Sequence, residues 1–363
     1  MRSTAMPMAR LSRRSRNILT TALAGALLGM AGCSAKRITA DPVYFPPAPA
    51  TPHVVHLKSF NALNDLVAVH QDWLDVLHGH LVSPFAAKPS GIAYRDGHLY
   101  ICDLEINAVH DWDLATGTSR RWGETGDVVL RKPVDVAVGG DGTLYVADTE
   151  RSSVVAIGPD GTARDLRTDR KAYRPVAVAV SGSTLYVADV AAHQVDAFTL
   201  PAGTVATTIG GVGDAPGKFY FPSGVAVDAA GRLYVSDMLN ARVQVLDADA
   251  KPLRSMGQPG DRYGDMGKPR GVDVGPDGVT FIADGEFQHV HLFDDQGRLL
   301  MLLGGPEEGA GSTPMPVGIA VARAVPDAVA ALVPANFDAD YYLFVTNSVG
   351  AKRISLYAVG LGR

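Results

Sequence analysis

The histidines in predicted β segments are the residues whose spacing best suits metal chemistry. His289 and His291 are two positions apart, so on a strand both imidazole rings lie on one face, where they can bind zinc. His193 lies in a similar segment further upstream. A catalytic zinc normally needs three protein ligands, and ligands in separate segments have to converge. We therefore favour independent surface histidines and expect no cofactor, with a zinc site at His193, His289 and His291 as the alternative.

Signatures of other common chemistries are absent from the sequence. It has no CxxCH haem motif, no Gly-rich phosphate loop and no nucleophile elbow, so haem, nucleotide and serine-hydrolase functions lack support. One of the two cysteines, Cys102, lies inside a β segment, where we expect a buried and unreactive thiol.

The segments that position these residues come from an internal repeat. Each copy reads Pro, Gly-Val-Ala-Val, a Gly turn, Leu-Tyr-Val-Ala-Asp and a further β run, and successive copies are 42 to 47 residues apart. The prolines are Pro89, Pro133, Pro175, Pro222, Pro269 and Pro316. The strand-ending acids are Asp103, Asp148, Asp189, Asp237 and Asp284, with Asn347 in the sixth copy. Such regular recurrence indicates one structural unit per copy.

The length of each unit predicts four antiparallel strands. One copy reads as strands over Ser223–Asp228, Arg232–Ser236, Arg242–Leu246 and Pro252–Met256. Six such units predict an all-β fold, a six-bladed β-propeller of four-stranded antiparallel blades. The last copy lacks a fourth strand, so we expect an N-terminal strand, Val54–Phe60, to close the ring. A solenoid is the rival architecture, but no capping repeats are present.

The copy that follows the repeat pattern most completely also resembles a known family. Residues 221–228 read Phe-Pro-Ser-Gly-Val-Ala-Val-Asp, and residues 233–245 read Leu-Tyr-Val-Ser-Asp-Met-Leu-Asn-Ala-Arg-Val-Gln-Val. These segments resemble NHL repeats, and the resemblance covers residues 54–363. It implies a six-bladed propeller, in a family with protein- and RNA-binding platforms, extracellular sensors and a zinc-dependent amidating lyase that uses channel histidines. Related six-bladed propellers include lactonases.

Three residues depart from the repeat and are our channel candidates. Asp273 stands where five copies have Ala, Asp135 where the others have Gly or Ala, and Arg270 replaces Ser or Val. Blades two and five face each other across a six-fold ring, so these side chains could border the channel from opposite sides as candidate binding residues. Their carboxylates would suit calcium better than zinc. We favour a structural role for the two acids, in which Asp135 caps a turn and Asp273 pairs with an Arg, because a buried carboxylate needs a partner. The recurring strand-ending acids are expected to accept backbone N–H bonds instead.

One face of the disc is expected to carry function. It holds the loop entering each first strand and the loop after each recurring acid, and we call it the top face. Basic residues on it could contact an anionic partner or glycan, with solvated loop residues as the alternative. They are Lys88, Lys132, Arg174, Arg242, Lys268 and Arg270.

Two insertions interrupt the repeat. Residues 62–80 follow a helical period, with Asn61 as the expected cap, and would place Trp73 at the channel mouth or pack over the closure seam. The second insertion, residues 323–340, falls on the opposite face and suggests no function.

The N-terminus resembles an export signal. Five arginines and no acid occur in residues 1–16, and a short apolar run ends in Ala31-Gly32-Cys33. This end resembles the lipobox of bacterial lipoproteins, in which the cysteine is acylated and the chain is cut just before it. We expect a signal peptide over 1–32, lipidated Cys33, a Pro-rich linker over 33–53 and the propeller over 54–363. Ser34 after the cysteine is compatible with the outer membrane, facing the periplasm.

Composition limits the remaining functional classes. The net charge is -5, and cleavage before Cys33 would remove five of the 33 basic residues and none of the 38 acidic ones, leaving -10. This balance argues against a nucleic-acid partner. We expect a lipid-anchored cell-envelope module that binds a protein, peptide or glycan, rather than an enzyme. The alternative is a metal-dependent lyase or lactone hydrolase at the channel.

Overall fold

The structure is a computed structural model. It describes residues 42–47, 50–51, 53–69, 85–124, 128–307 and 309–360. The expected signal peptide, Cys33 and Trp73 lie outside these residues, as does most of the insertion over 62–80. Within the described part of the chain, no helix is both long and apolar enough to cross a membrane.

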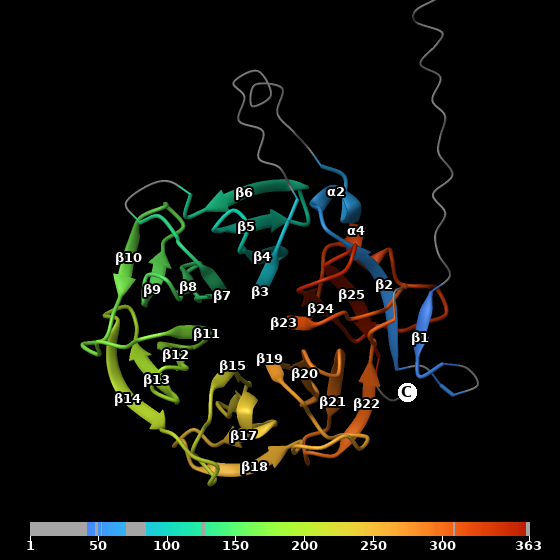
Figure 1. Cartoon of the computed structure of the whole chain (residues 1–363). Helices are drawn as coiled ribbons and strands as arrows, with labels where there is room; N and C mark the ends of the chain where they lie inside the picture. The colour runs from blue at the N-terminus through green and yellow to red at the C-terminus, as the bar shows by residue number, and fades with distance from the viewer. Residues whose placement is uncertain are drawn as a thin grey trace, which may run out of the picture. The chain divides into compact units, whose positions relative to one another are not determined.

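Six antiparallel sheets are arranged in a ring around a central axis (Figure 1). Blade 1 consists of β3 (Pro89–Arg95), β4 (His98–Asp103), β5 (Ala108–Asp113) and β6 (Thr118–Trp122). Blade 2 consists of β7 (Pro133–Val138), β8 (Leu144–Asp148), β9 (Ser153–Ile157) and β10 (Ala163–Leu166). Blade 3 consists of β11 (Pro175–Ser181), β12 (Thr184–Asp189), β13 (Gln194–Thr199) and β14 (Thr204–Gly210). Blade 4 consists of β15 (Pro222–Val227), β16 (Leu233–Asp237), β17 (Arg242–Leu246) and β18 (Pro252–Met256). Blade 5 is β19 (Pro269–Val274), β20 (Thr280–Asp284), β21 (His289–Phe293) and β22 (Leu299–Leu303). The predicted six-bladed propeller is confirmed.

The sixth blade closes the ring with a strand from the other end of the chain. It is built from β23 (Pro316–Ala322), β24 (Tyr341–Asn347), β25 (Ile354–Val359) and β2 (Val54–Phe60). β2 pairs antiparallel with β25, from Val54 opposite Val359 to Phe60 opposite Ile354. This pairing agrees with the predicted closure. A fifth strand, β1 (Val43–Phe45), pairs with β2 inside the segment expected to be a Pro-rich linker.

Apolar side chains on both surfaces of each blade hold neighbouring blades together. Among the described residues, one buried cluster lies at each of the six blade junctions. On β7, for example, Val136 packs toward blade 1 and Ala137 toward blade 3. Strand alternation turns successive side chains to opposite blade surfaces, which explains the near-continuous apolar runs in the repeat.

A short helix lies over the closure seam. α2 (Leu63–Leu66) buries Leu63 and Leu66 in the cluster shared by blades 6 and 1, so the described part of the insertion packs over the seam. The predicted Asn61 cap is wrong, because Ala62 occupies the N-cap position. The Asn61 side chain instead donates to the Ala351 carbonyl and accepts from the Arg353 N–H. The second insertion contains α4 (Asp327–Ala330), whose Val329 joins the same cluster.

We expect deletion of Val54–Phe60 to lower the Tm by about 10 °C or more and to promote aggregation. The deletion exposes the edge of β25 and removes buried residues from both clusters next to the seam. Thermal unfolding followed by circular dichroism would measure the change. Deletion of Val43–Phe45, a partly exposed edge strand, is the control and should have a much smaller effect. Equal Tm values for the two deletions would contradict closure by β2.

Candidate functional site

The recurring acids tie together the loops of the top face. In five blades the carboxylate accepts backbone N–H groups from the loop that enters the innermost strand, at 2.6 to 3.1 Å. Asp284, for example, binds Gly267 N at 2.7 Å and Glu286 N in the following loop at 2.9 Å. These acids are structural, as expected from their recurrence.

Glycines let the innermost strands approach one another closely. Two residues after the proline, a Cβ on Gly224 would lie 2.1 Å from the Arg270 carbonyl, and one on Gly271 would lie 2.4 Å from the Val317 carbonyl. Gly91 and Gly318 are equally confined by the next blade. Blade 2 has Asp135 at this position, and its side chain extends toward the next blade instead.

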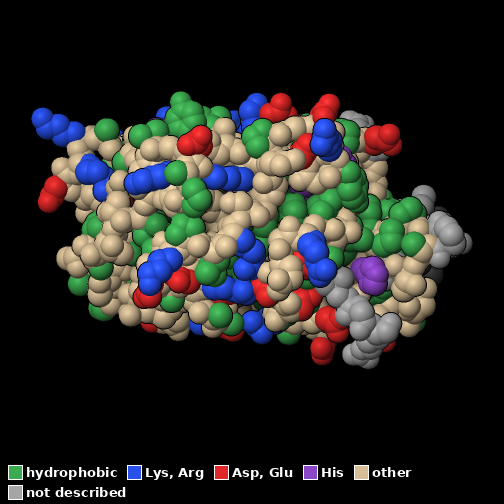
Figure 2. Space-filling view, turned by 90° about the horizontal axis from the view of Figure 1, so that it is seen from below, with side chains coloured by type: hydrophobic (Ala, Val, Ile, Leu, Met, Phe, Trp, Pro, Cys, Tyr) green, Lys and Arg blue, Asp and Glu red, His purple; other side chains and the backbone are tan. Residues whose placement is uncertain are grey.

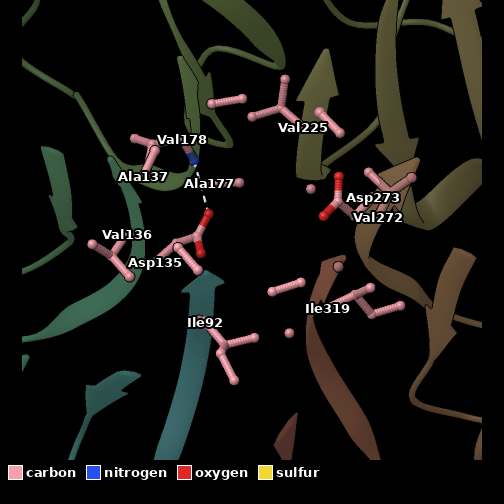
Figure 3. Close-up of a pocket in the computed structure, with 18 of the residues that line it drawn as sticks. Ile92, Asp135, Val136, Ala137, Ala177, Val178, Val225, Val272, Asp273 and Ile319 are labelled. Carbon is pink, nitrogen blue, oxygen red and sulfur yellow. Dashed lines mark hydrogen bonds between the residues drawn. The ribbon is translucent and has the colours of Figure 1, made fainter. Parts of the chain in front are cut away.

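The innermost strands enclose a channel of about 360 Å³. Apolar side chains make up most of its wall, and Asp135 and Asp273 project into it from opposite sides (Figure 3). Asp135 Oδ2 accepts the Val178 N–H at 2.9 Å, and Asp273 Oδ2 accepts the Val321 N–H at 2.7 Å. Each acid therefore binds the backbone of the following blade. The structure brings together the two carboxylates that broke the repeat pattern.

Burial in the wall of the channel raises the pKa of both carboxyl groups. Burial raises the pKa of Asp135 to about 7, against the opposing effect of its backbone hydrogen bonds, and the Asp273 charge adds to the increase. Burial likewise raises the pKa of Asp273 to about 6. Each side chain is partly exposed to the channel, while the surrounding strands bury the rest of it. Neither acid is in an ion pair with a described residue, so the expectation that Asp273 pairs with an Arg is wrong.

Arg270 lines the top end of the same channel. Burial lowers the pKa of its guanidinium, and the charge of Asp284 opposes that change. Its Nε is buried without a hydrogen-bond partner among the described residues. Arg270 therefore contributes charge at the channel mouth without neutralising the two carboxylates below.

The candidate zinc ligands do not converge. His193 Nδ1 accepts the Phe221 N–H at 3.1 Å, whereas His291 lies buried in blade 5 with its Nε2 3.7 Å from Asp284 Oδ2. Burial lowers the pKa of His291 to about 4. The described residues contain no group of three or more His, Cys, Asp or Glu side chains arranged to hold a metal. These residues therefore do not fit a three-ligand zinc site with His193, His289 and His291.

The basic residues of the top face differ in their contacts with the rest of the protein. Arg242 donates to Asp237 at 2.9 Å and to the Lys218 carbonyl at 3.1 Å, so it stabilises loops. Lys132 lies 4.0 Å from Glu150, while Arg174 is exposed. None of these three lines the channel. The expected basic rim is therefore reduced to scattered exposed charges.

The top face also carries exposed apolar side chains that sequence analysis missed. Among the described residues, every large apolar side chain exposed in a loop lies on this face; the remaining exposed ones lie on outermost strands. The loop residues are Phe85, Val129, Val212, Tyr220, Leu239, Tyr263 and Val349. An apolar Met238-Leu239 pair directly after a strand-ending acid was the signal available in the sequence.

Part of this apolar surface adjoins the channel. The Tyr220 ring lies 5.2 Å from the His193 ring, and Leu239 N donates to the Tyr220 carbonyl at 3.0 Å. Their neighbours Phe221 and Met238 line the channel. On the rim of the disc, by contrast, apolar, basic and acidic side chains are interspersed (Figure 2).

Comparison with known families identifies the repeat. The model of the NHL repeat matches residues 130–157 and 219–246, which span the entering loop and first three strands of blades 2 and 4. The chain contains NHL repeats. No curated protein matches the chain.

Solved structures resemble the NHL propeller in fold. A gluconolactonase from Xanthomonas campestris is 16% identical, with 88% of this chain and 96% of that chain covered and a TM-score of 0.57. A virginiamycin B lyase from Staphylococcus aureus is 13% identical, with coverage of 76% and 85% and a TM-score of 0.52. A calcium-binding regucalcin from Agrobacterium tumefaciens is 14% identical, with coverage of 75% and 89% and a TM-score of 0.53. These similarities establish a shared architecture.

We expect Asp135→Asn to raise the Tm at pH 8 by about 2–6 °C and to have little effect at pH 5. The raised pKa means that the folded protein binds the proton more tightly than the unfolded chain. That contribution to stability is complete below about pH 4 and is lost as the pH rises through about 7. Calorimetric Tm values across this range would test the sign.

Asp141→Asn is the control for this titration. Asp141 is an exposed loop acid whose pKa is lowered chiefly by the Thr143 backbone N–H, so it is ionised throughout this range. Parallel Tm curves for wild type and Asp135→Asn would show that the channel acid is not perturbed.

Proposed function

We propose that this protein is a lipid-anchored module of the bacterial cell envelope that binds a protein or peptide partner through its top face. The observation that carries the proposal is the asymmetric distribution of exposed apolar side chains, since those in loops lie on this face. Loops on a rigid scaffold commonly carry the residues that bind a partner, and apolar groups exposed in them can contact it.

The top face combines the features of a protein-binding surface. Tyr263 and Val212 are 73% and 67% exposed, whereas the strand-ending acids beneath them hold the loop backbones in place. Arg174 and Lys88 are also exposed on this face and add positive charge to it. Exposed aromatic residues are enriched in protein–protein interfaces, so Tyr220 and Tyr263 favour a protein or peptide over a glycan as the partner.

The membrane association rests on the N-terminal sequence. Cys33 after Ala31-Gly32 would carry the lipid, and the chain between it and β2 would connect the propeller to the membrane. The partner would then be a component of the envelope, facing the periplasm.

The alternative, a metal-dependent lyase or lactone hydrolase, rests on architecture. The similar lyase and gluconolactonase are 13% and 16% identical to this chain. The regucalcin likeness suggests calcium, but among the described residues no cluster suited to a metal accompanies it. The binding function has a structural observation of its own, and the enzymatic function does not.

We expect Cys33→Ser to release the protein from membranes, because the variant lacks the thiol that would be acylated. Fractionation of envelope membranes, followed by immunoblotting, would measure the distribution. Ser34→Ala, which keeps the cysteine, is the matched control. Retention of Cys33→Ser in the membrane fraction would refute the lipid anchor.

We expect the double change Leu239→Ser and Tyr263→Ser to reduce recovery of the envelope partner about tenfold or more. Both residues are exposed, so the fold should survive the loss of their apolar contacts with a partner. In-cell crosslinking followed by affinity purification and mass spectrometry would identify the partner and quantify its loss. Lys132→Glu with Arg174→Glu would test the basic contribution.

Leu253→Ser is the matched control. Leu253 lies on the outermost strand of blade 4 and is 49% exposed, against 51% for Leu239. Loss of the partner in the Leu253 variant, with recovery unchanged in the top-face variants, would move the interface to the rim.

A further inference from the structure

The channel contains acidic side chains that the ring geometry does not require. Five blades have Ala where blade 5 has Asp273, and four have Gly where blade 2 has Asp135. The innermost strands of those blades pair in the same way without a carboxylate. Enclosing an acid costs free energy unless a partner compensates it, and local rules tend to fail at functional sites.

The hydrogen bonds that Asp135 and Asp273 accept leave part of the acceptor capacity of each carboxyl group unused. Asp135 Oδ2 and Asp273 Oδ2 each accept one backbone N–H from the following blade. Asp273 Oδ1 accepts a second N–H, from Val274 at 2.8 Å. A carboxylate has about four acceptor sites, and no described cation pairs with either residue. Carboxyl groups with unused acceptor capacity and no described cationic partner therefore face the channel from both sides.

The rest of the wall near these acids is apolar. Figure 3 shows Ile92, Val136, Val178, Val225, Val272 and Ile319 surrounding the two carboxylates. A volume of about 360 Å³ is at the small end of ligand pockets. Such a space suits a compact molecule with one positively charged group and an apolar body.

We propose that the channel binds a small organic amine as its ammonium cation, with the charge held by Asp135 and Asp273 and the apolar body against the valine and isoleucine walls. This site goes beyond the proposed function, because it lies inside the ring and not on the top face. Calcium is less suitable, since it takes six to eight oxygen ligands and two carboxylates supply at most four.

Binding of the amine should be linked to proton release. Asp135 has a pKa of about 7 and Asp273 a pKa of about 6, so part of the channel is protonated near neutral pH. An ammonium ion needs the ionised acids, so its affinity should increase with pH. We expect binding at pH 5.5 to be about tenfold or more weaker than at pH 8.

The neighbouring titratable groups do not reverse this trend. The buried thiol of Cys102, near Asp135, stays neutral because burial raises its pKa well above the usual value. Burial also raises the pKa of Tyr94, which lines the channel. Arg270 at the top end stays cationic over this pH range, with Asp284 beside it. The two channel acids therefore dominate the titration.

Isothermal titration of the full-length protein with phenethylamine would test the proposal, with 2-phenylethanol as the uncharged analogue and Ca²⁺ as the competing cation. We expect one phenethylamine per chain, no comparable binding of the alcohol, and tenfold or greater loss in Asp135→Asn and in Asp273→Asn. Asparagine keeps an acceptor for the Val178 and Val321 N–H groups, so both variants should fold, as their Tm would show. Asp141→Asn should bind as wild type does.

Several outcomes would overturn the amine site. They are no binding of phenethylamine, equal binding of the alcohol, or unchanged binding in the Asn variants. Stoichiometric Ca²⁺ binding that is lost in those variants, without amine binding, would replace it with a metal site. The Leu239→Ser and Tyr263→Ser changes should leave amine binding intact, so failure of the partner-binding proposal can be distinguished from failure of this one.

Discussion

The propeller depends on the hydrogen bonds that are accepted by the carboxylate at the end of a blade's second strand. Five blades place an Asp there, and its oxygens bind backbone N–H groups of the loop entering the innermost strand. In four of them it also binds an N–H of the following turn. A buried backbone N–H without a partner is costly, so this bond fixes the loop and directs the innermost strand toward the axis. The sixth blade has Asn347, whose Oδ1 is buried without a described partner and whose amide donates to Ser355 Oγ, and this blade is completed by β2 pairing with β25.

The regularity of these caps makes the departures from the repeat informative. Glycine lets the backbone of one innermost strand contact that of the next, and alanine fills the position nearest the axis. Asp135 and Asp273 replace such small residues with ionisable groups that bind backbone N–H groups and keep unused acceptor capacity in the channel. The same scaffold thus supplies rigidity through acids that recur and charge through acids that do not.

Fold prediction succeeded because its signals are local and repeated. The four strands expected for blade 4 differ from the observed ones by at most one residue at either end, and the closing strand has the predicted bounds. The opposed placement of Asp135 and Asp273 followed from six-fold symmetry, although their backbone partners did not. Asn61 was misassigned because its side chain is used across the seam, by residues far away in sequence. Likewise, the exposure of Leu239 and Tyr263 depends on the positions of neighbouring loops, which a strand pattern does not encode.

Pairing of β2 with β25 also sets the order in which the molecule can be completed. Val54 is made more than 300 residues before its partner Val359, so the contact that closes the ring joins two widely separated parts of the chain. Blades 1 to 5 each consist of consecutive strands and can assemble as they are made, but blade 6 stays open until β25 has been made. Forming so distant a contact is entropically costly and slow, and an open sheet edge persists meanwhile. The chain is therefore vulnerable to aggregation during the interval between the synthesis of β2 and its pairing with β25.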